Sequence, residues 1–407
     1  MASEQSVLLP QKLPKGWNLV RFGDVVRNTK ERVDREKTKL TRYIAGEHMS
    51  SEDVHLREWG ELNGDYLGPA FHRRFCKGQV LYGSRRTYLK KVALAPFDGI
   101  TANTTFVVES SNAETLLPEL LPFVMLTDSF TEHSIRESKG SVNPYVNWKD
   151  IAKYEFALPP KREQQRIADV LWAADECLET RTRLVAQLKR SWQCLIDEVV
   201  PTPESGVSTN SRAFGEVCEM QNGRPFPSKH YKTDGFKLLR PGNLNPNGVL
   251  SWNEKATACL DEEHVIANPD HVVREGDVVI NLTAQSLEDG FMGRVCLARK
   301  GDESLLNQRI GRFICKPDIS SEYLFRVLQT SRFRRLVESR CEGSKVRHTY
   351  FRHFEKMPVV VLEPNRELVV IEKARTIDRA RDSAVAAEVT ARELGAQLRE
   401  QLLGGGA

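Results

Sequence analysis

The sequence lacks the marks of a membrane, secreted or zinc-binding protein. Hydrophobic residues make up 40% of the chain, yet no apolar run approaches the ~20 residues that a membrane helix requires. The N-terminus has no basic start followed by an apolar block, as a secretory signal would. The eight cysteines are scattered without a C-x-x-C pair, which indicates reduced thiols. We therefore expect a cytoplasmic protein that holds no structural metal and does not enter a membrane.

Complete catalytic motifs are also lacking. Val142–Tyr145 is without the second proline of the N-P-P-Y loop of amino-methyltransferases, and no Gly-rich turn offers a site for a methyl donor. Pro269–Asp270 and Pro317–Asp318 are not followed by the Glu-x-Lys of a nuclease metal site, and turns explain them better. Gly343–Lys345 lacks the residue order of a phosphate-binding loop. We expect a recognition component without catalytic residues or a cofactor. A self-contained methyltransferase or nuclease is the enzyme alternative.

What the chain does contain is a repeat. Phe22–Val26 is similar to Phe214–Cys218, which lies near the start of the second copy. Lys139–Tyr145, which contains glycine and ends in an aromatic residue, is answered by a similar loop at Gly343–Tyr350. In each copy this loop is followed by a short apolar run, proline, and a long charged helical pattern. The duplication predicts two similar sites in one chain.

Each copy has the pattern of an α+β domain. Short apolar runs among Gly, Pro, Asn and Asp are typical of short strands. The clearest runs are Gln79–Tyr82, Val92–Ala95 and Thr105–Val108 in the first copy, and Phe236–Leu239, Gly276–Ile280 and Arg294–Leu297 in the second. One further helix is expected in each copy, at Pro118–Thr131 and at Ser321–Val337.

A heptad pattern follows each copy. The first seam is Ile167, Leu171, Ala174, Leu178, Val185, Leu188, Trp192, Leu195 and Val199. The second is less regular: Val370, Ala374, Ile377, Ala384, Ala391, Leu398 and Leu402, with Arg381, Glu388 and Gly395 between them. Because each apolar stripe must be covered, we expect the two helices to pair antiparallel within the chain. Oligomerisation through these helices is the alternative.

The basic excess lies outside these helices. The net charge is +4, whereas residues 162–200 hold six basic and seven acidic residues and residues 366–403 hold seven of each. The excess therefore belongs to the two α+β domains, where it favours a polyanionic partner.

Candidate nucleic-acid contacts occur in both copies. Arginine pairs well with guanine, and Asn or Gln with adenine, while hydroxyls and basic groups contact phosphates. In the first copy the candidates are Arg73, Arg74, Arg85, Arg86, Tyr88, Lys90, Lys139, Ser141, Asn143 and Tyr145. In the second they are Asn222, Arg224, Asn281, Gln285, Arg309, Lys345, Arg347, His348 and Tyr350. The alternatives are a solvated surface for the charged residues and turn capping for Asn222 and Asn281.

The chain resembles the DNA-specificity subunits of type I restriction-modification systems over nearly its whole length. The resemblance is carried chiefly by Tyr154–Pro160 with the following Lys161–Ala168, and by the Gly276–Ile280 strand. The second junction, Leu362–Ile371, departs from the pattern because it lacks the Gln pair and one of two prolines.

The resemblance implies an α+β protein with two target-recognition domains, a pseudo-twofold repeat, and two antiparallel helices that form a coiled coil between the domains. Its expected divisions are an N-terminal tail at 1–11, domain 1 at 12–161, spacer helix 1 at 162–200, a linker at 201–212, domain 2 at 213–365, spacer helix 2 at 366–403, and a C-terminal tail at 404–407.

It further implies that each domain reads half of a split, asymmetric site in double-stranded DNA. Catalysis would belong to partners: two modification (methyltransferase) subunits and restriction or translocase subunits. This chain would then bind neither S-adenosylmethionine nor ATP. A stand-alone, sequence-specific DNA-binding regulator is the alternative, as is an adaptor that touches only proteins.

Overall fold

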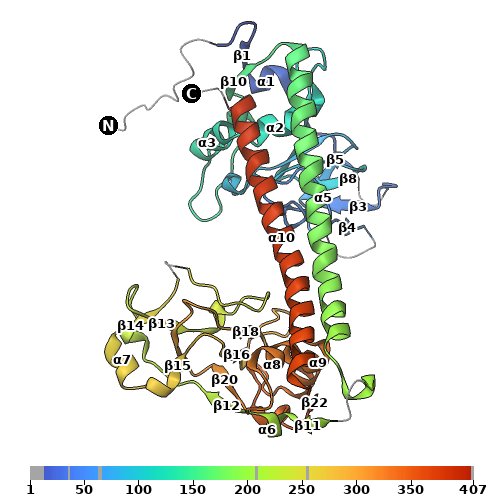
Figure 1. Ribbon diagram of the computed structural model, residues 1–407. Helices are drawn as coiled ribbons and strands as arrows, with labels where there is room; N and C mark the ends of the chain where they lie inside the picture. Colours follow the sequence, from blue (N-terminus) through green and yellow to red (C-terminus); the bar gives the residue numbers. More distant parts are fainter. Residues whose placement is uncertain (1–12, 35–36, 63–66, 207–209, 254–255, 405–407) are drawn as a thin grey trace. The chain divides into compact units, whose positions relative to one another are not determined.

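The computed structural model describes residues 13–34, 37–62, 67–206, 210–253 and 256–404 (Figure 1). The chain forms two compact units: unit 1 comprises residues 1–182 and 387–407, and unit 2 comprises residues 183–386. The tail expected at 1–11 lies outside the described residues, as do residues 207–209 of the expected linker and residues 405–407. All eight cysteines are free thiols, as their spacing predicts. A search of the described helices found none long and apolar enough to span a bilayer.

Unit 1 contains two four-stranded sheets. The first has the order β2 (Val26–Thr29), β9 (Thr105–Ser110), β6 (Val80–Gly83), β7 (Val92–Leu94) and is antiparallel throughout. The second has the order β4 (Gly60–Glu61), β3 (Arg42–Ile44), β8 (Gly99–Ala102), β5 (Phe71–Phe75), with β3 and β8 parallel. A separate pair joins β1 (Asn18–Arg21) to β10 (Glu155–Leu158).

Unit 2 repeats this topology strand for strand. Its antiparallel sheet is β12 (Cys218–Asn222), β20 (Ile310–Cys315), β16 (Val278–Asn281), β18 (Val295–Leu297). Its mixed sheet is β14 (Cys259–Leu260), β13 (Phe236–Leu239), β19 (Ser304–Leu306), β15 (Val272–Val273), with β13 and β19 parallel. The flanking pair is β11 (Ser211–Ala213) with β22 (Pro358–Val360), and one more pair joins β17 (Thr283–Ala284) to β21 (Arg347–His348). The predicted duplication and the predicted strands are confirmed.

The same turn introduces the central strand of each antiparallel sheet. Gly78 and Gly276 have φ of 88° and 86°, a region that a residue with a Cβ rarely adopts. The residues that follow in β6 and β16 are buried on both sides of the sheet, which explains why these strands are continuous apolar runs rather than alternating ones.

Short helices cover the sheets. In unit 1 they are α1 (Phe22–Val25), η1 (Gly46–His48), η2 (Thr87–Leu89), η3 (Pro118–Leu120), α2 (Leu121–Met125), α3 (Asp128–Arg136) and α4 (Trp148–Ile151). In unit 2 they are η4 (Pro203–Ser205), α6 (Phe214–Val217), η5 (Ser228–His230), η6 (Pro241–Asn243), α7 (Glu262–Ile266), η7 (Pro269–His271), α8 (Ser321–Leu328), α9 (Ser331–Arg340) and η8 (Phe351–His353).

The single helices expected at 118–131 and 321–337 are wrong, because each is broken by a threonine. Thr127 and Thr330 have extended backbones, and their side chains accept hydrogen bonds from the main chains of Phe130 and Phe333. Each threonine therefore caps a new helix, α3 or α9. The break occurs at the same place in both units.

The two long helices are α5 (Lys161–Val199) and α10 (Pro364–Leu403). In unit 1, Thr182 Oγ1 of α5 donates to Glu388 Oε1 of α10 over 3.0 Å. In unit 2, Trp192 Nε1 of α5 donates to Asp378 Oδ1 of α10 over 2.9 Å. In unit 1 the start of α5 thus lies beside the end of α10. In unit 2 the end of α5 lies beside the start of α10. This confirms the predicted antiparallel pairing within one chain.

The seam of α5 shifts near its end. Leu195 was expected in the seam but is 37% exposed, whereas Ile196 is fully buried and Val200 is 3% exposed. From Trp192 the buried positions advance by four residues, because an α-helix with 3.6 residues per turn drifts from a strict heptad. Here α5 packs into the core of unit 2 as well as against α10.

Candidate nucleic-acid interface

In unit 1 the structure brings two predicted loops together. The loop after β6 and the loop after α3 form a β-bridge between Arg85 and Tyr145, and Tyr145 also pairs with Lys139. The main-chain nitrogen of Val146 donates to Ser84 over 2.9 Å. The two loops therefore form one surface, although some fifty residues separate them in the sequence.

The first of these loops contains a strained turn. Arg86 and Lys90, on either side of η2, have φ of 50° and 47°, in the left-handed region that residues other than glycine seldom adopt. Lys90 is held by ion pairs with Glu52 and Asp128. Its ammonium group thus anchors the turn, and contact of Lys90 with DNA stays a prediction.

The anchored turn presents three side chains to solvent. Tyr88 is 54% exposed, and Arg85 and Arg86 are exposed as well. Arg86 Nε donates to Asn143 Oδ1 of the second loop over 3.4 Å. Among the described residues, neither arginine has an acidic partner within 4.0 Å, so their charge is available to an anion.

Other basic candidates in unit 1 have partners within the protein. Arg73 Nη1 donates to the main chain of Thr105, and burial lowers the pKa of Arg73. Arg74 pairs with Glu31 and Asp98. Lys139 lies 3.5 Å from Asp150, which is buried, while Ser141 and Tyr145 are exposed beside it.

Unit 2 contains the same loop pair. Thr283 and Ala284 of β17 pair with His348 and Arg347 of β21, and Gln285 is exposed directly after them. Comparison with unit 1 shows that the residue equivalent to Tyr145 is His348. Tyr145 forms a β-bridge with Lys139 in unit 1, and His348 forms a β-bridge with Glu342 in unit 2. In each case the two bridged residues are six positions apart.

The second loop of unit 2 is braced by its own charges. Glu342 accepts from Arg352 over 2.9 Å and lies 3.0 Å from His353 Nε2, and these hydrogen bonds, that from Arg352 first, lower the pKa of Glu342. The guanidinium of Arg352 lies 4.3 Å from the centre of the Tyr350 ring. Sequence reasoning missed Arg352, and its spacing two residues after Tyr350 was the only signal.

The remaining candidates of unit 2 differ in accessibility. Arg309 is exposed, and its main-chain oxygen accepts from Leu282 at the base of the loop pair. Asn222 and Arg224 are exposed, and Arg224 donates to Asn268. Asn281 is fully buried, and its amide donates to the main-chain oxygens of Thr283 and Phe291. This corrects the expected base contact by Asn281, since its side chain caps the turn.

Comparisons with known proteins agree with this geometry. The family model described as the type I restriction modification DNA specificity domain matches residues 14–190. The type I restriction enzyme MjaVIII specificity subunit of Methanocaldococcus jannaschii is 22% identical over 366 residues, which cover 80% of this chain and 77% of that protein. The chain is similar to type I restriction-modification specificity subunits. The matched region takes in most of unit 1 and continues along α5.

Solved structures show the same fold. A chain from a study of complex assembly and conformational transition of the type I R-M system has a TM-score of 0.64 at 19% identity, covering 97% of this chain and 99% of that one. A type I restriction-modification S subunit from M. genitalium has a TM-score of 0.55 at 13% identity, covering 96% and 98%. The two-unit α+β fold is therefore shared with these structures.

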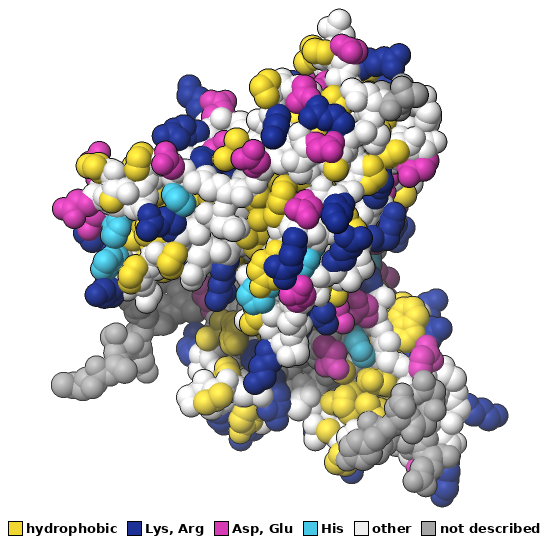
Figure 2. Space-filling view, turned by 90° about the horizontal axis from the view of Figure 1, so that it is seen from below, with side chains coloured by type: hydrophobic (Ala, Val, Ile, Leu, Met, Phe, Trp, Pro, Cys, Tyr) yellow, Lys and Arg dark blue, Asp and Glu magenta, His cyan; other side chains and the backbone are white. Residues whose placement is uncertain are grey.

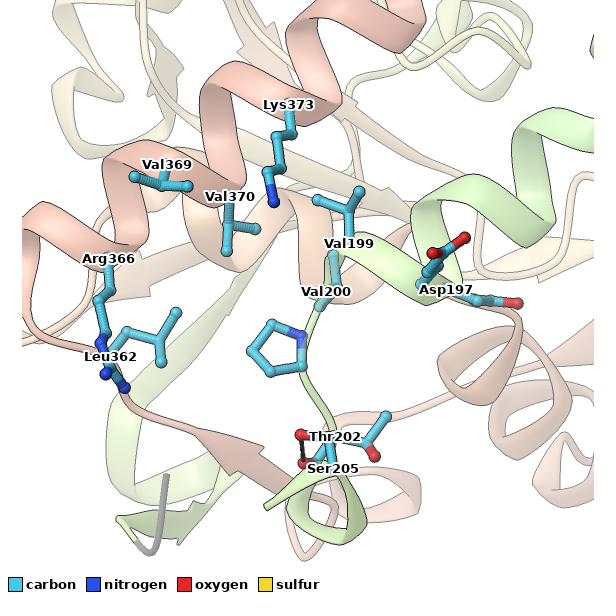
Figure 3. A pocket seen from close by; sticks show the side chains of 12 residues that line it. Asp197, Val199, Val200, Thr202, Ser205, Leu362, Arg366, Val369, Val370 and Lys373 are labelled. Carbon is cyan, nitrogen blue, oxygen red and sulfur yellow. Dashed lines mark hydrogen bonds between the residues drawn. The ribbon is translucent and has the colours of Figure 1, made fainter. Parts of the chain in front are cut away.

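Outside the loop pairs, a groove of about 440 Å³ lies in unit 2 beside the start of α10 (Figure 3). Val199, Val200 and Val370 contribute apolar side chains, with the basic Arg366 and Lys373 of α10 near them. The lining residues include no histidine or cysteine. Figure 2 shows basic and acidic side chains interspersed on the face it displays, with hydrophobic ones between them.

Proposed function

We propose that this chain is the DNA sequence-specificity subunit of a type I restriction-modification complex, and that each unit reads one half of a bipartite, asymmetric DNA site. The observation that carries the proposal is the loop pair, which recurs at the same edge of the same fold in both units with different side chains. Equivalent positions support two equivalent docking modes, while different side chains support different half-sites.

Double-stranded DNA would be held by two kinds of contact. Accessible cations such as Arg85, Arg86 and Lys345 give a salt-dependent attraction to phosphates, and amide, hydroxyl and guanidinium groups in the loops distinguish bases. Asn143, Gln285 and Tyr350 belong to the second group, together with Asn222, Arg224 and Arg309 near the loop pair of unit 2.

The paired helices would set the number of unread base pairs between the half-sites and provide docking surfaces for modification subunits, two of them if the repeat is used symmetrically. Methylation, and cleavage where a restriction subunit is present, would belong to those partners. This chain would supply recognition without catalysis.

A domain exchange tests the proposal. Residues 12–161 are replaced by the matching segment of a relative with another target, and the chain is expressed with its modification partner. Methylation should change in one half-site only, with the other half and the spacer retained. A change in both halves would contradict independent reading by the units.

A further inference from the structure

The loop pairs of the two units are equivalent residue by residue. Val146 donates its main-chain N–H to Ser84 in unit 1, and Thr349 donates to Leu282 in unit 2, each over 2.9 Å. The next residues of the first loops are therefore Arg85 in unit 1 and Thr283 in unit 2, and they pair with Tyr145 and His348 respectively. Side chains in the two units can thus be compared position by position.

In unit 1 the cations lie on the first loop. Arg85 and Arg86 are exposed there, whereas the second loop, Lys139–Tyr145, has Lys139 as its one charged residue. The Lys139 side chain is exposed too, but its ammonium group lies 3.5 Å from the buried Asp150. Among the described residues, the positive charge of this loop pair that has no acidic partner therefore lies on the first loop.

In unit 2 the arrangement is reversed. The first loop continues as Thr283, Ala284 and Gln285, which are neutral. The second loop has Lys345 and Arg347 at the places of Val142 and Pro144 of unit 1. At equivalent positions, the cations of unit 1 lie on the first loop and those of unit 2 lie on the second loop. The nearby Arg309 lies on a third segment.

Each cation-bearing loop has a constrained frame. In unit 1 the left-handed Arg86 and Lys90 bracket η2, and Lys90 is fixed by two carboxylates. In unit 2 the loop begins with Gly343 at φ 103° and is braced at its base by the hydrogen bond between Glu342 and His353. A fixed backbone lets a guanidinium meet a base edge at low entropic cost.

We propose, on the basis of the proposed function, that the two units read their half-sites with opposite loops: unit 1 with the Arg85–Tyr88 turn and unit 2 with the Lys345–His348 hairpin. In each unit the cationic loop contacts bases in the major groove, where arginine pairs bidentately with guanine. The neutral loop beside it supports that loop and adds the amide group of Asn143 in unit 1 or Gln285 in unit 2.

The test is methylome sequencing of a host that expresses the full chain with its modification partner. The double variants are R85A/R86A and K345A/R347A. Each should relax base preference in one half-site only, and the two should affect different halves, with at least about a tenfold rise in methylation at sites with a wrong base. The matched control, K77A/K300A, removes two exposed lysines outside the loop pairs and should leave the motif unchanged.

A further double variant guards against misfolding. R85K/R86K keeps the charge but loses bidentate geometry, and it should relax the same half-site as R85A/R86A while the complex stays assembled. The proposal is overturned if wild type methylates a bipartite site and the double variants lower the extent of methylation without changing base preference, or if both relax the same half. A wild-type complex that methylates no bipartite site would instead overturn the proposed function, and this inference with it.

Discussion

Glu367 of unit 2 occupies the position that Gln164 holds in unit 1, in the first turn of the long helix. The Gln164 carboxamide accepts from the main chain of Leu117 and donates to the oxygens of Thr115 and Pro159. Glu367 Oε2 likewise accepts from the main chain of Ser320. Its buried Oε1 has no hydrogen-bond partner among the described residues, and burial raises the pKa of Glu367. A carboxylate cannot make the donations that the carboxamide makes.

The substitution Glu367→Gln should therefore stabilise unit 2 at neutral pH, by about 1–2 kcal/mol. Because the pKa of Glu367 is raised in the folded state, unit 2 loses stability as the pH rises from the unfolded pKa of a glutamate, about 4.3, through the folded pKa. The stability gained by Glu367→Gln should therefore shrink when the pH falls below that range. Thermal unfolding between pH 4 and pH 8 measures it. Gln164→Glu is the reciprocal control and should destabilise unit 1; an unchanged midpoint in both variants would refute the equivalence.

A second pH dependence is expected in unit 1. His55 Nε2 lies 2.7 Å from Asp175 Oδ2 of α5, and this hydrogen bond raises the pKa of His55. The stabilisation is present below the unfolded pKa of about 6.5 and is lost as pH rises through the folded value. Asp175→Asn should flatten the fall in thermal midpoint between pH 6 and pH 9. His72→Gln, at a ring bonded to the main chain of Pro69, should not.

A buried ion cluster joins α8 to both long helices within unit 2. Asp378 contacts Arg326 Nη1 at 2.5 Å, Arg381 Nη2 at 3.4 Å and Trp192 Nε1 at 2.9 Å, and the two arginines are 3% and 7% exposed. Asp378→Ala leaves buried cations without their shared partner and should cost about 3–5 kcal/mol of unfolding free energy.

The matched control is Asp382→Ala, which removes a half-exposed partner of Arg381 and should cost less than about 1 kcal/mol. Denaturant unfolding of both variants gives the comparison. Equal costs would show that Asp378 is not the centre of the cluster.

Sequence patterns predicted the duplicated fold, its central strands and the paired helices, because these follow from apolar periodicity and from the order of turns. The breaks at Thr127 and Thr330 were missed, since a threonine caps a helix only where the local backbone is extended. Burial of Ile196 in place of Leu195 depends on the core that α5 enters, which its own heptads do not encode.

The site was predicted at the level of loops but not of individual side chains. Both loops of each pair were identified, yet nothing in the sequence shows that Lys90 pairs with Asp128 or that Asn281 turns inward. The sequence matched the second loops of the two units as segments, whereas the bridge geometry pairs individual residues, Tyr145 with His348. Such assignments depend on contacts between distant segments.

The proposal that the two long helices set the distance between the half-sites gives a prediction about spacing. Seven residues are inserted after Thr182 in α5 and seven after Ala386 in α10, which keeps the two seams in step. The added length is about 10 Å, or roughly three base pairs of B-DNA. The unread spacer should lengthen by about that amount, or methylation should be lost. An insertion in α5 alone breaks the pairing and should abolish activity. Unchanged spacing in the double insertion would exclude the proposal that the helices set the number of unread base pairs.

The most direct measurement is the methylated motif itself, read by methylome sequencing of a host that carries this chain with its modification partner. Two different half-sites separated by a fixed number of unread base pairs are expected, because two units with unlike loops are linked by paired helices. A contiguous or palindromic motif, or none, would contradict the account.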